Sequence, residues 1–341
     1  DPKTKHLPEL TPDRLCYLPA SMLHMYVDKE AVAEKKLACN VDSMVIPINR
    51  SMLIKNDLLV LDMLNTTEWE RPMYFAVTVG TENYVNLQKY FRLEGLAYRI
   101  APYVDKAPKD LKDKRNTMSQ VQVGTVATDK MYDIVMNKFR WGFFNKEGLD
   151  IDETKARMAY TTRSELGRLA EALIEEAEYA EKYKKFIVGN EELDLETFIS
   201  RAPESAKERD PQDYIKSYAA NRRMMASKVM EKVELEVPTN VAVHNYYSLS
   251  MEANHYRIGE NEKGDDILRS YGRENWQELN YYLSLDESRL IASLSEMQMN
   301  GTIYYHLMSI AKQYGRTSLM DELAVMYDEN MQKVDFLMGE D

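Results

Sequence analysis

The chain has 341 residues and a net charge of −12, with 44% hydrophobic and 29% charged residues. This length predicts two or three domains, and the apolar content is enough to bury a core in each. Lysine and arginine form no dense stripe, although a duplex-binding protein needs clustered cations to displace counterions. The composition therefore argues against a nucleic-acid partner.

No stretch of the sequence reaches 18 consecutive apolar residues, so we expect no segment to span a bilayer. The chain opens with Asp-Pro-Lys-Thr-Lys and lacks an apolar signal core, so we expect it to begin within a larger protein. Cys16 and Cys39 lack the spacing of a zinc or redox motif. They form either a disulfide in an oxidising compartment or two buried thiols.

Residues 1–105 predict a small α/β module. Strand-like runs occur at 22–27, 44–48, 73–79 and 97–103, and helix-like runs at 29–37, 51–66 and 81–93. Ser51 and Thr81 are the candidate caps of the second and third helices. Strands and helices that alternate over short connections favour parallel pairing with right-handed crossovers, so we expect a parallel βαβ-type module.

Residues 106–124 read as a linker, and residues 125–341 as helices. Thr128 is expected to cap a segment through 139, Asp150 with Glu153 forms a capping box, and Asp210-Pro211 is a helix start. The expected helices are 128–139, 150–186, 210–236, 241–258, 261–283, 286–299, 300–314 and 317–337. The predicted class is α+β and mostly α, with a parallel βαβ-type module followed by an α-helical solenoid.

Two of the helix breaks repeat one pattern. Gly259 and Gly315 each follow an aromatic residue closely, and Tyr271 and Tyr327 each stand twelve residues after the glycine. This spacing resembles degenerate tetratricopeptide repeats, which stack helix pairs. Gly264 fits the small position of such a repeat, whereas the corresponding Met320 does not.

The sequence contains no catalytic constellation that we recognise. It lacks a Gly-x-Ser-x-Gly elbow, a His-Glu-x-x-His pair and a glycine-rich phosphate loop, so no catalytic residue, metal ligand or cofactor is predicted. Gly80-Thr81 can offer backbone amides to an anion, but a plain βα turn is the favoured interpretation. Two acidic clusters are interpreted as solvated surface: Glu175, Glu176 and Glu178, then Glu191, Glu192 and Asp194.

Two sets of residues are candidates for ligand binding. The first is a tyrosine groove in the helical part, since tyrosine combines a flat apolar ring with a polar tip; the alternative is core packing. It comprises Tyr246, Tyr247, Tyr281, Tyr282, Tyr304 and Tyr305 with His244 and His306. The second is a crevice at the carboxyl ends of the parallel strands, with loop and capping chemistry as the alternative. It comprises Asn49, Arg50, Thr78, Gly80, Thr81 and Asn83.

Several long motifs carry a family resemblance. They are NDLLVLD (56–62), WERPMYFA (69–76), YFRLEGLAYR (90–99), MYDIVMNKFRWG (131–142) and ELNYYL (278–283). Together they resemble the C-terminal soluble region of multi-spanning membrane proteins of Bacteroidetes. That former domain-of-unknown-function family is now grouped with protein O-mannosyltransferases of the GT-C superfamily.

The resemblance implies an N-terminal membrane domain, absent from this chain, as anchor and partner. It also implies a lipid-phosphate-linked sugar donor and a catalytic acidic residue in an early extracytoplasmic loop of that membrane domain, so no catalytic residue is carried over. The segment is then expected on the periplasmic side of the cytoplasmic membrane, where it could bind an acceptor polypeptide or another periplasmic protein.

Three hypotheses follow. The chain is a non-catalytic extracytoplasmic domain of a membrane glycosyltransferase, a helical-repeat scaffold for protein partners unrelated to sugar transfer, or an independent enzyme. An upstream membrane region with an acidic first loop favours the first hypothesis over the second. An enclosed pocket with convergent buried acids is what the third would require.

Overall fold

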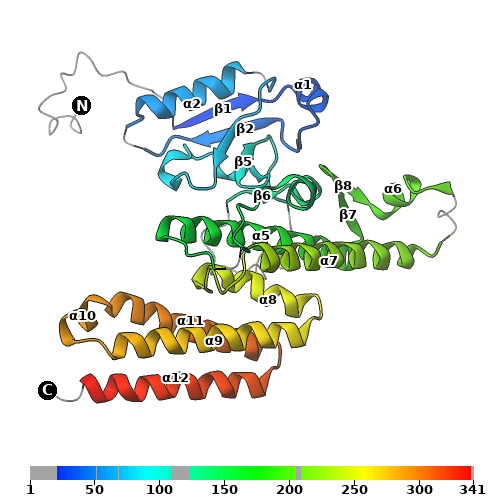
Figure 1. Cartoon of the computed structure of the whole chain (residues 1–341). Coiled ribbons are helices and arrows are strands. Elements are labelled where there is room, and N and C mark those ends of the chain that lie inside the picture. Colours follow the sequence, from blue (N-terminus) through cyan, green and yellow to red (C-terminus); the bar gives the residue numbers. More distant parts are fainter. Residues whose placement is uncertain are drawn as a thin grey trace, which may run out of the picture.

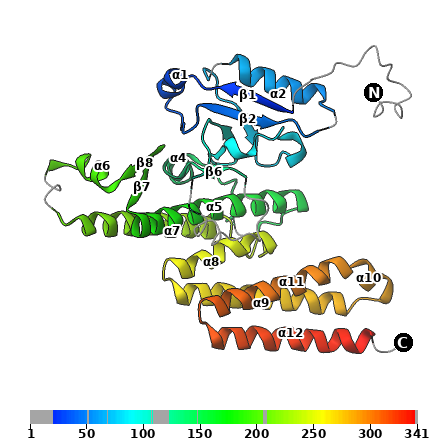
Figure 2. The ribbon, with the colours of Figure 1, turned by 180° about the vertical axis from the view of Figure 1, so that it is seen from behind.

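A computed structural model describes residues 21–338, apart from 51, 68, 107, 109–122, 147 and 205–208 and the side chains of 247, 250 and 334–338. A small α/β module forms one end of the molecule, and the helices lie in layers beneath it (Figure 1 and Figure 2). The fold is therefore α+β and mostly α, as the sequence predicts. Cys16 and the proposed cap Ser51 lie outside the described residues, and the Cys39 side chain is half-buried.

The first sheet of the module is an antiparallel ribbon, so the prediction of a parallel βαβ unit is wrong here. Its elements are β1 (Met22–Tyr26), α1 (Lys29–Glu34), β2 (Ser43–Pro47) and α2 (Lys55–Thr66). Tyr26 pairs with Ser43, and Met22 with Pro47. A helix of six residues spans about 9 Å, which is too short to carry the chain back along a strand of about 17 Å for parallel pairing.

The second sheet is mixed, with strand order β3-β5-β4-β6. Its strands are β3 (Tyr74–Ala76), β4 (Phe91–Leu93), β5 (Ala97–Ile100) and β6 (Thr125–Val126). The β3–β5 and β4–β5 pairs are antiparallel, and β4 pairs with β6 in parallel. Phe91 and Leu93 point into the core, because alternate residues of a strand share a face.

The helix predicted over 81–93 does not form. Two 3₁₀ turns replace it, η2 (Thr81–Asn83) and η3 (Gln88–Tyr90), and the chain then enters β4. Val85 and Asn86 between them have φ values of 52° and 60°, in the left-handed region that interrupts a helix. A turn does begin at Thr81, but Gly80 occupies the N-cap position and no side chain caps the turn, so the prediction of Thr81 as a cap is wrong.

The first helical layer is built on two long helices. α5 (Glu153–Tyr183) packs along α7 (Pro211–Glu236), and α4 (Thr128–Asp133) with a π-helical turn, η4 (Ile134–Lys138), lies beside them. Asp210 accepts a hydrogen bond from the Gln212 amide, which confirms the predicted cap. The caps predicted for the other two helices are misplaced: α5 is capped by Asp152, not Asp150, and Ala127 rather than Thr128 precedes α4.

The helix predicted through 186 ends earlier, at Tyr183, and the C-cap residue Lys184 has a φ of 56°. An unpredicted hairpin follows, made of β7 (Lys185–Val188) and β8 (Glu191–Asp194), and then α6 (Leu195–Ser200). Phe186 stacks on Phe198 with ring centroids 4.1 Å apart and contacts Tyr218 at 5.1 Å. These aromatic contacts form a small core of their own at the far end of α5.

The C-terminal helices confirm the predicted repeat of the turns. They are η6 (Tyr246–Ser248), α8 (Leu249–Arg257), α9 (Asn261–Leu283), α10 (Glu287–Ala292), α11 (Leu294–Gln313) and α12 (Thr317–Met338). The Glu260 amide donates to the His255 carbonyl (2.9 Å), as the Arg316 amide does to the Ala311 carbonyl (2.8 Å). The α8–α9 and α11–α12 turns therefore share one geometry, whereas the break predicted at 299–300 lies at Ser293. The tetratricopeptide assignment stays a prediction.

Candidate functional site

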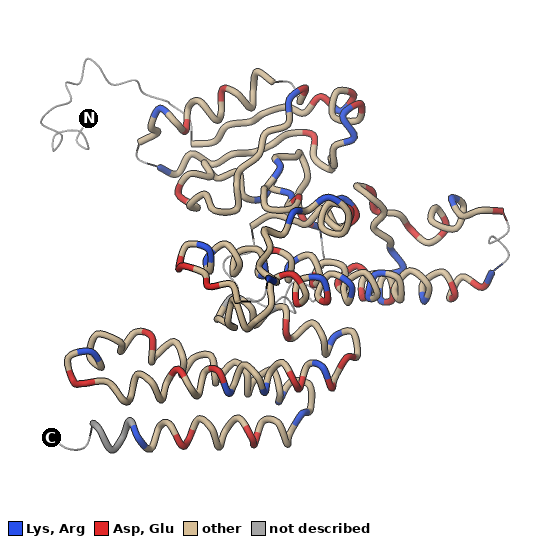
Figure 3. The backbone as a smooth tube through the Cα atoms, in the orientation of Figure 1, with Lys and Arg blue, Asp and Glu red and all other residues tan. Residues whose placement is uncertain are grey.

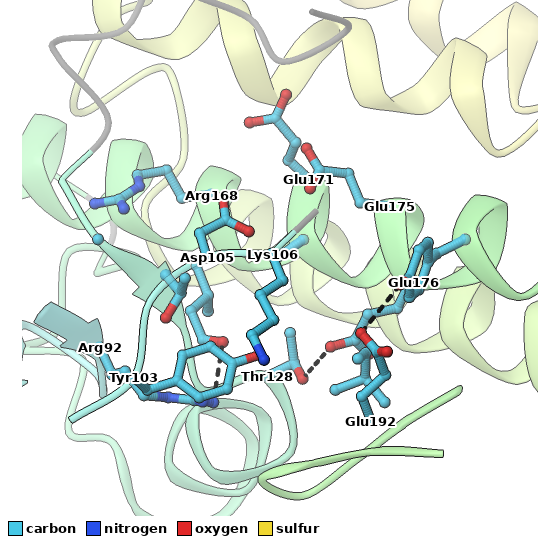
Figure 4. Close-up of a pocket in the computed structure, with 16 residues that line it drawn as sticks. Arg92, Tyr103, Asp105, Lys106, Thr128, Arg168, Glu171, Glu175, Glu176 and Glu192 are labelled. Carbon is cyan, nitrogen blue, oxygen red and sulfur yellow. Dashed lines mark hydrogen bonds between the residues drawn. The ribbon is translucent and has the colours of Figure 1, made fainter. Parts of the chain in front are cut away.

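A cavity of about 120 Å³ lies where the α/β module meets α5 and the β7–β8 hairpin, and we call it the junction cavity (Figure 4). Its lining is polar and aromatic, with both signs of charge. The lining residues are Arg92, Tyr103, Asp105, Lys106, Gly124, Thr125, Val126, Thr128, Arg168, Glu171, Ala172, Glu175, Glu176, Tyr179, Ile187 and Glu192.

Helix α5 supplies the acidic wall of the junction cavity. Arg168, Glu171, Glu175 and Tyr179 follow one another at three- and four-residue steps, which brings them to one helix face. The interpretation of Glu175 and Glu176 as solvated surface is wrong, because both residues are buried. Helix α5 contacts the module, α7 and α8, and its buried carboxylates Glu165, Glu171 and Glu176 lie beside arginines.

Arg168 connects the module to α5. Its guanidinium donates to Glu165 Oε2 (2.9 Å), to Tyr98 Oη (3.0 Å) and to the Val123 carbonyl (2.9 Å). The three acceptors come from the helix, from β5 and from the chain entering β6. A buried guanidinium with directional partners of this kind fixes the orientation of the module on the helix.

Glu176 is a buried carboxyl group of the cavity with partners from two other helices. The Thr128 hydroxyl donates to its Oε1 (2.6 Å), and Arg222 Nε lies 3.0 Å from its Oε2. Burial raises the pKa of Glu176 to about 7, outweighing the attraction of Arg222. The group can therefore accept or donate a proton at neutral pH, which is a property of ligand-binding and catalytic sites.

Two tyrosines complete the cavity. The Arg92 guanidinium lies over the Tyr103 ring at 4.6 Å, and the Tyr179 hydroxyl donates to Glu192 Oε2 (3.0 Å). Rings with polar tips beside carboxylates and arginine suit a ligand that carries hydroxyl or amide groups. Sequence reasoning singled out Glu175, Glu176 and Glu192 and placed them on the surface. The spacing of arginine and glutamate at three- and four-residue steps along α5 was the available signal.

The predicted tyrosine groove is divided among several places. Tyr246 and Tyr305 both contact His306, at ring distances of 5.9 Å and 5.5 Å. Tyr304 is fully buried and donates to the Gly272 carbonyl (3.0 Å), as core packing would require. The Tyr247 side chain lies outside the described residues.

The other members of that set lie elsewhere. Tyr281 is exposed and contacts Tyr282 at 5.8 Å, and the Tyr282 hydroxyl donates to Glu278 (2.9 Å). His244 stacks on Tyr271 at 4.9 Å, and its Nδ1 lies 2.8 Å from a Glu252 carboxylate oxygen. Ligand binding by these residues stays a prediction.

The predicted crevice lacks the parallel edge on which it was based, because β2 and β3 belong to different sheets. Arg50 pairs with Asp57 (3.2 Å) and donates to the Glu82 carbonyl, and Asn49 accepts from Asn86 (2.8 Å). These are contacts that hold a loop. The remaining members of the set are exposed: Thr78, Gly80, Thr81 and Asn83.

Within the described part of the chain, no three His, Cys, Asp or Glu side chains gather as metal ligands. Nor does any described helix combine the length and apolar character needed to cross a bilayer.

A comparison with models of protein families gives a match to the N-terminal part of the chain. Residues 1–123 match the model of a family described as TMEM260-associated domain 2, which is consistent with a domain tied to a membrane protein family. No curated protein and no solved structure matches the chain. The matched segment includes β1 to β5 and ends two residues before β6.

Proposed function

We propose that the chain is a non-catalytic, extracytoplasmic domain of a membrane-embedded glycosyltransferase-like protein, and that it binds the acceptor polypeptide or another partner. The observation that carries this proposal is the match of residues 1–123 to a domain associated with a membrane protein. The motif resemblance to the GT-C protein O-mannosyltransferase group agrees with that match. On this proposal the chemistry belongs to the membrane domain, and the chain lies on the periplasmic side of the membrane, as the motif resemblance implies.

The junction cavity is the binding place that the geometry supports best. It combines aromatic rings with carboxylates, two arginines and a carboxyl group whose pKa is raised to about 7. A polypeptide offers amides, hydroxyls and charged side chains to such a lining, and a cavity of about 120 Å³ has room for one side chain of an acceptor rather than for a longer segment. The module shares one core with α5 and α7, so the cavity lies between elements that pack on one another.

A binding experiment tests this proposal. The chain is titrated with extracytoplasmic polypeptides that carry serine and threonine acceptors, and calorimetry follows the heat. We expect saturable binding that weakens by about tenfold in a Tyr103→Ala/Glu175→Gln variant, because an aromatic contact and a charge are lost. Tyr305→Ala is the matched control, since Tyr305 is exposed in the helical part.

The outcomes separate the hypotheses. Loss of binding in Tyr305→Ala alone would move the site to the tyrosine groove, and no binding in any titration would overturn the acceptor role. Binding to polypeptides without acceptor residues at equal affinity would favour the general scaffold. Incubation of the chain with a lipid-linked sugar and acceptor should give no transfer, and measurable transfer would overturn the non-catalytic assignment.

A further inference from the structure

Two arginines lie side by side on the polar face of the second sheet. Arg92 of β4 pairs with Arg99 of β5 across the antiparallel ladder. Their neighbours Phe91 and Tyr98 point to the opposite face, into the apolar core. The Nε atoms of both arginines are buried, and neither has a hydrogen-bond partner among the described residues.

Arg92 carries the strongest indication of a missing partner. It is 5% exposed, its Nη2 lies 3.5 Å from the Val126 carbonyl, and its guanidinium covers the Tyr103 ring. Within the described chain, no carboxylate oxygen lies at ion-pair distance from it. Arginine remains protonated at neutral pH even when burial lowers its pKa, and a buried unpaired cation is costly.

Both arginines line a second cavity of about 320 Å³, which we call the arginine cavity. Its charged lining residues are Lys36, Arg92, Glu94, Arg99, Asp129 and Lys130. The cavity lies between the Lys36–Ala38 loop, the start of α4 and the β7–β8 turn, and Arg92 lines both this cavity and the junction cavity. The Asn190 side chain of that turn donates to the Lys36 carbonyl (2.8 Å), which closes one rim.

The two acids of the arginine cavity are already engaged. Asp129 pairs with Arg222 and accepts from the Gly189 amide (2.7 Å). Glu94 is shared between Lys130 (2.6 Å) and Arg99 (3.8 Å). The single carboxylate of Glu94 therefore faces two cations and can neutralise the charge of only one. The lining keeps a net positive charge that no described carboxylate balances.

We propose that the arginine cavity binds a phosphate-type dianion, held by the guanidinium groups of Arg92 and Arg99 with Lys36 at the rim. Two planar guanidinium groups offer forked donors that match the oxygens of a phosphoryl group. A dianion neutralises both arginines at once, whereas a carboxylate neutralises one. The volume also admits the first atoms of an ester, so inorganic phosphate, a soluble phosphomonoester and a lipid headgroup share the required chemistry.

Calorimetric titration of the chain with inorganic phosphate at neutral pH tests the proposal, with acetate as the monoanion and glycerol phosphate as the ester. We expect a single saturable site for phosphate, and binding of acetate weaker by about tenfold or more. Sedimentation with phosphatidylcholine vesicles, with or without phosphatidic acid, tests whether the bound phosphoryl group belongs to a lipid headgroup. Binding of soluble phosphate or only of the acidic vesicles supports the proposal, and binding of neither overturns it.

Variants locate the site. Arg99→Gln and Lys36→Gln should each weaken phosphate binding, by about tenfold for the arginine, because each removes a charge-assisted donor. Lys35→Gln is the matched control, since Lys35 adjoins Lys36 but does not line the cavity. Arg92→Lys keeps the charge of the buried position and removes the fork.

Thermal melts identify variants that fail to fold, and phosphate should raise the melting temperature of the wild-type chain through linkage. Equal affinity in Arg99→Gln and the wild type, or an equal loss in Lys35→Gln and Lys36→Gln, would overturn the assignment.

Discussion

Helices α5 and α9 each run between two layers of the molecule, but their buried faces differ. The buried face of α5 carries charged residues: Arg163, Glu165, Arg168, Glu171, Glu175 and Glu176. That of α9 carries small, apolar and uncharged polar ones: Gly264, Leu268, Tyr271, Gly272, Asn275 and Leu279. Figure 3 shows acidic and basic residues at close intervals along α5 and α7.

The difference follows from what each helix packs against. α5 must orient a sheet module on a helical layer, and directional ion pairs restrict rotation as well as distance. α9 packs against α8, α11 and α12, where glycines let aromatic and leucine side chains approach the backbone. The orientation of the module on α5 is therefore set by ion pairs. The orientation of α9 against α8, α11 and α12 is set by close packing of side chains.

The largest expected effect concerns the ion pair of α5. Arg168→Met should lower the free energy of unfolding by about 3–5 kcal/mol, because Glu165 is left buried and uncompensated. The Arg168→Met/Glu165→Met double variant should recover most of that loss. Arg269→Met in α9 is the control, since its pair with Glu322 is partly exposed and should contribute under about 1 kcal/mol. Urea unfolding measures the free energy of unfolding of all three variants. Equal losses in Arg168→Met and Arg269→Met would contradict the proposed difference between α5 and α9.

The second effect depends on pH. The pKa of Glu176 is raised to about 7 in the folded protein from the usual 4.5, so the folded state binds this proton more tightly than the unfolded state. The contribution of Glu176 to stability is therefore greatest below pH 4.5 and is lost as the pH rises to about 7. Glu176→Gln removes the titration. Its unfolding free energy relative to the wild type should rise by about 2–3 kcal/mol between pH 5 and 8. Parallel stability curves would contradict this.

The third effect concerns the glycines of α9. A Cβ at Gly264 would lie 2.7 Å from Tyr256 Cζ, and one at Gly272 would overlap Leu323 Cδ2. Alanine at either position should cost about 1–3 kcal/mol through overpacking. Gly301→Ala in α11 is the control, because a Cβ there meets nothing within 4 Å and should stabilise the helix by about 0.5–1 kcal/mol. Thermal denaturation distinguishes the signs, and a neutral Gly272→Ala would refute the close approach.

The smallest expected effect on the free energy of unfolding concerns the adjacent residues Tyr304 and Tyr305. Tyr304→Phe should cost about 1 kcal/mol, because the buried hydroxyl donates to the Gly272 carbonyl. Tyr305→Phe should change the unfolding free energy by less than about 0.5 kcal/mol, since that side chain is exposed. Urea midpoints measure the pair of variants, and equal costs would mean that the two rings share one environment.

Elements with local signals could be predicted from the sequence. The Asp210-Pro211 start and the helix at 261–283 agree with the structure, because caps and apolar spacing lie within a few residues of each helix. Strand pairing direction could not be predicted, since it depends on residues far apart in the chain. The β7–β8 hairpin was missed because Phe186 continues the apolar pattern of α5.

The candidate site was harder to predict for a related reason. Glu175 and Glu176 have the composition of a solvated face, and their burial depends on Arg222 of α7, Thr128 of α4 and the module. A charged residue on a helix reveals its environment only when its partners are known. Arg92 likewise falls in the sequence within a run predicted as helix, and its place in β4 and its unpaired Nε become visible only in the folded sheet.

Strand β6 determines where this chain can be cut. The family match stops at residue 123, yet β6 continues the sheet beside β4, and the Ala127 amide donates to the Leu93 carbonyl (3.1 Å). A fragment truncated at 123 would leave the β4 edge open to pairing with a second molecule, which invites aggregation. Excision of the module as a monomer therefore requires an endpoint beyond Ala127 and a substitute for the apolar cover that α5 provides.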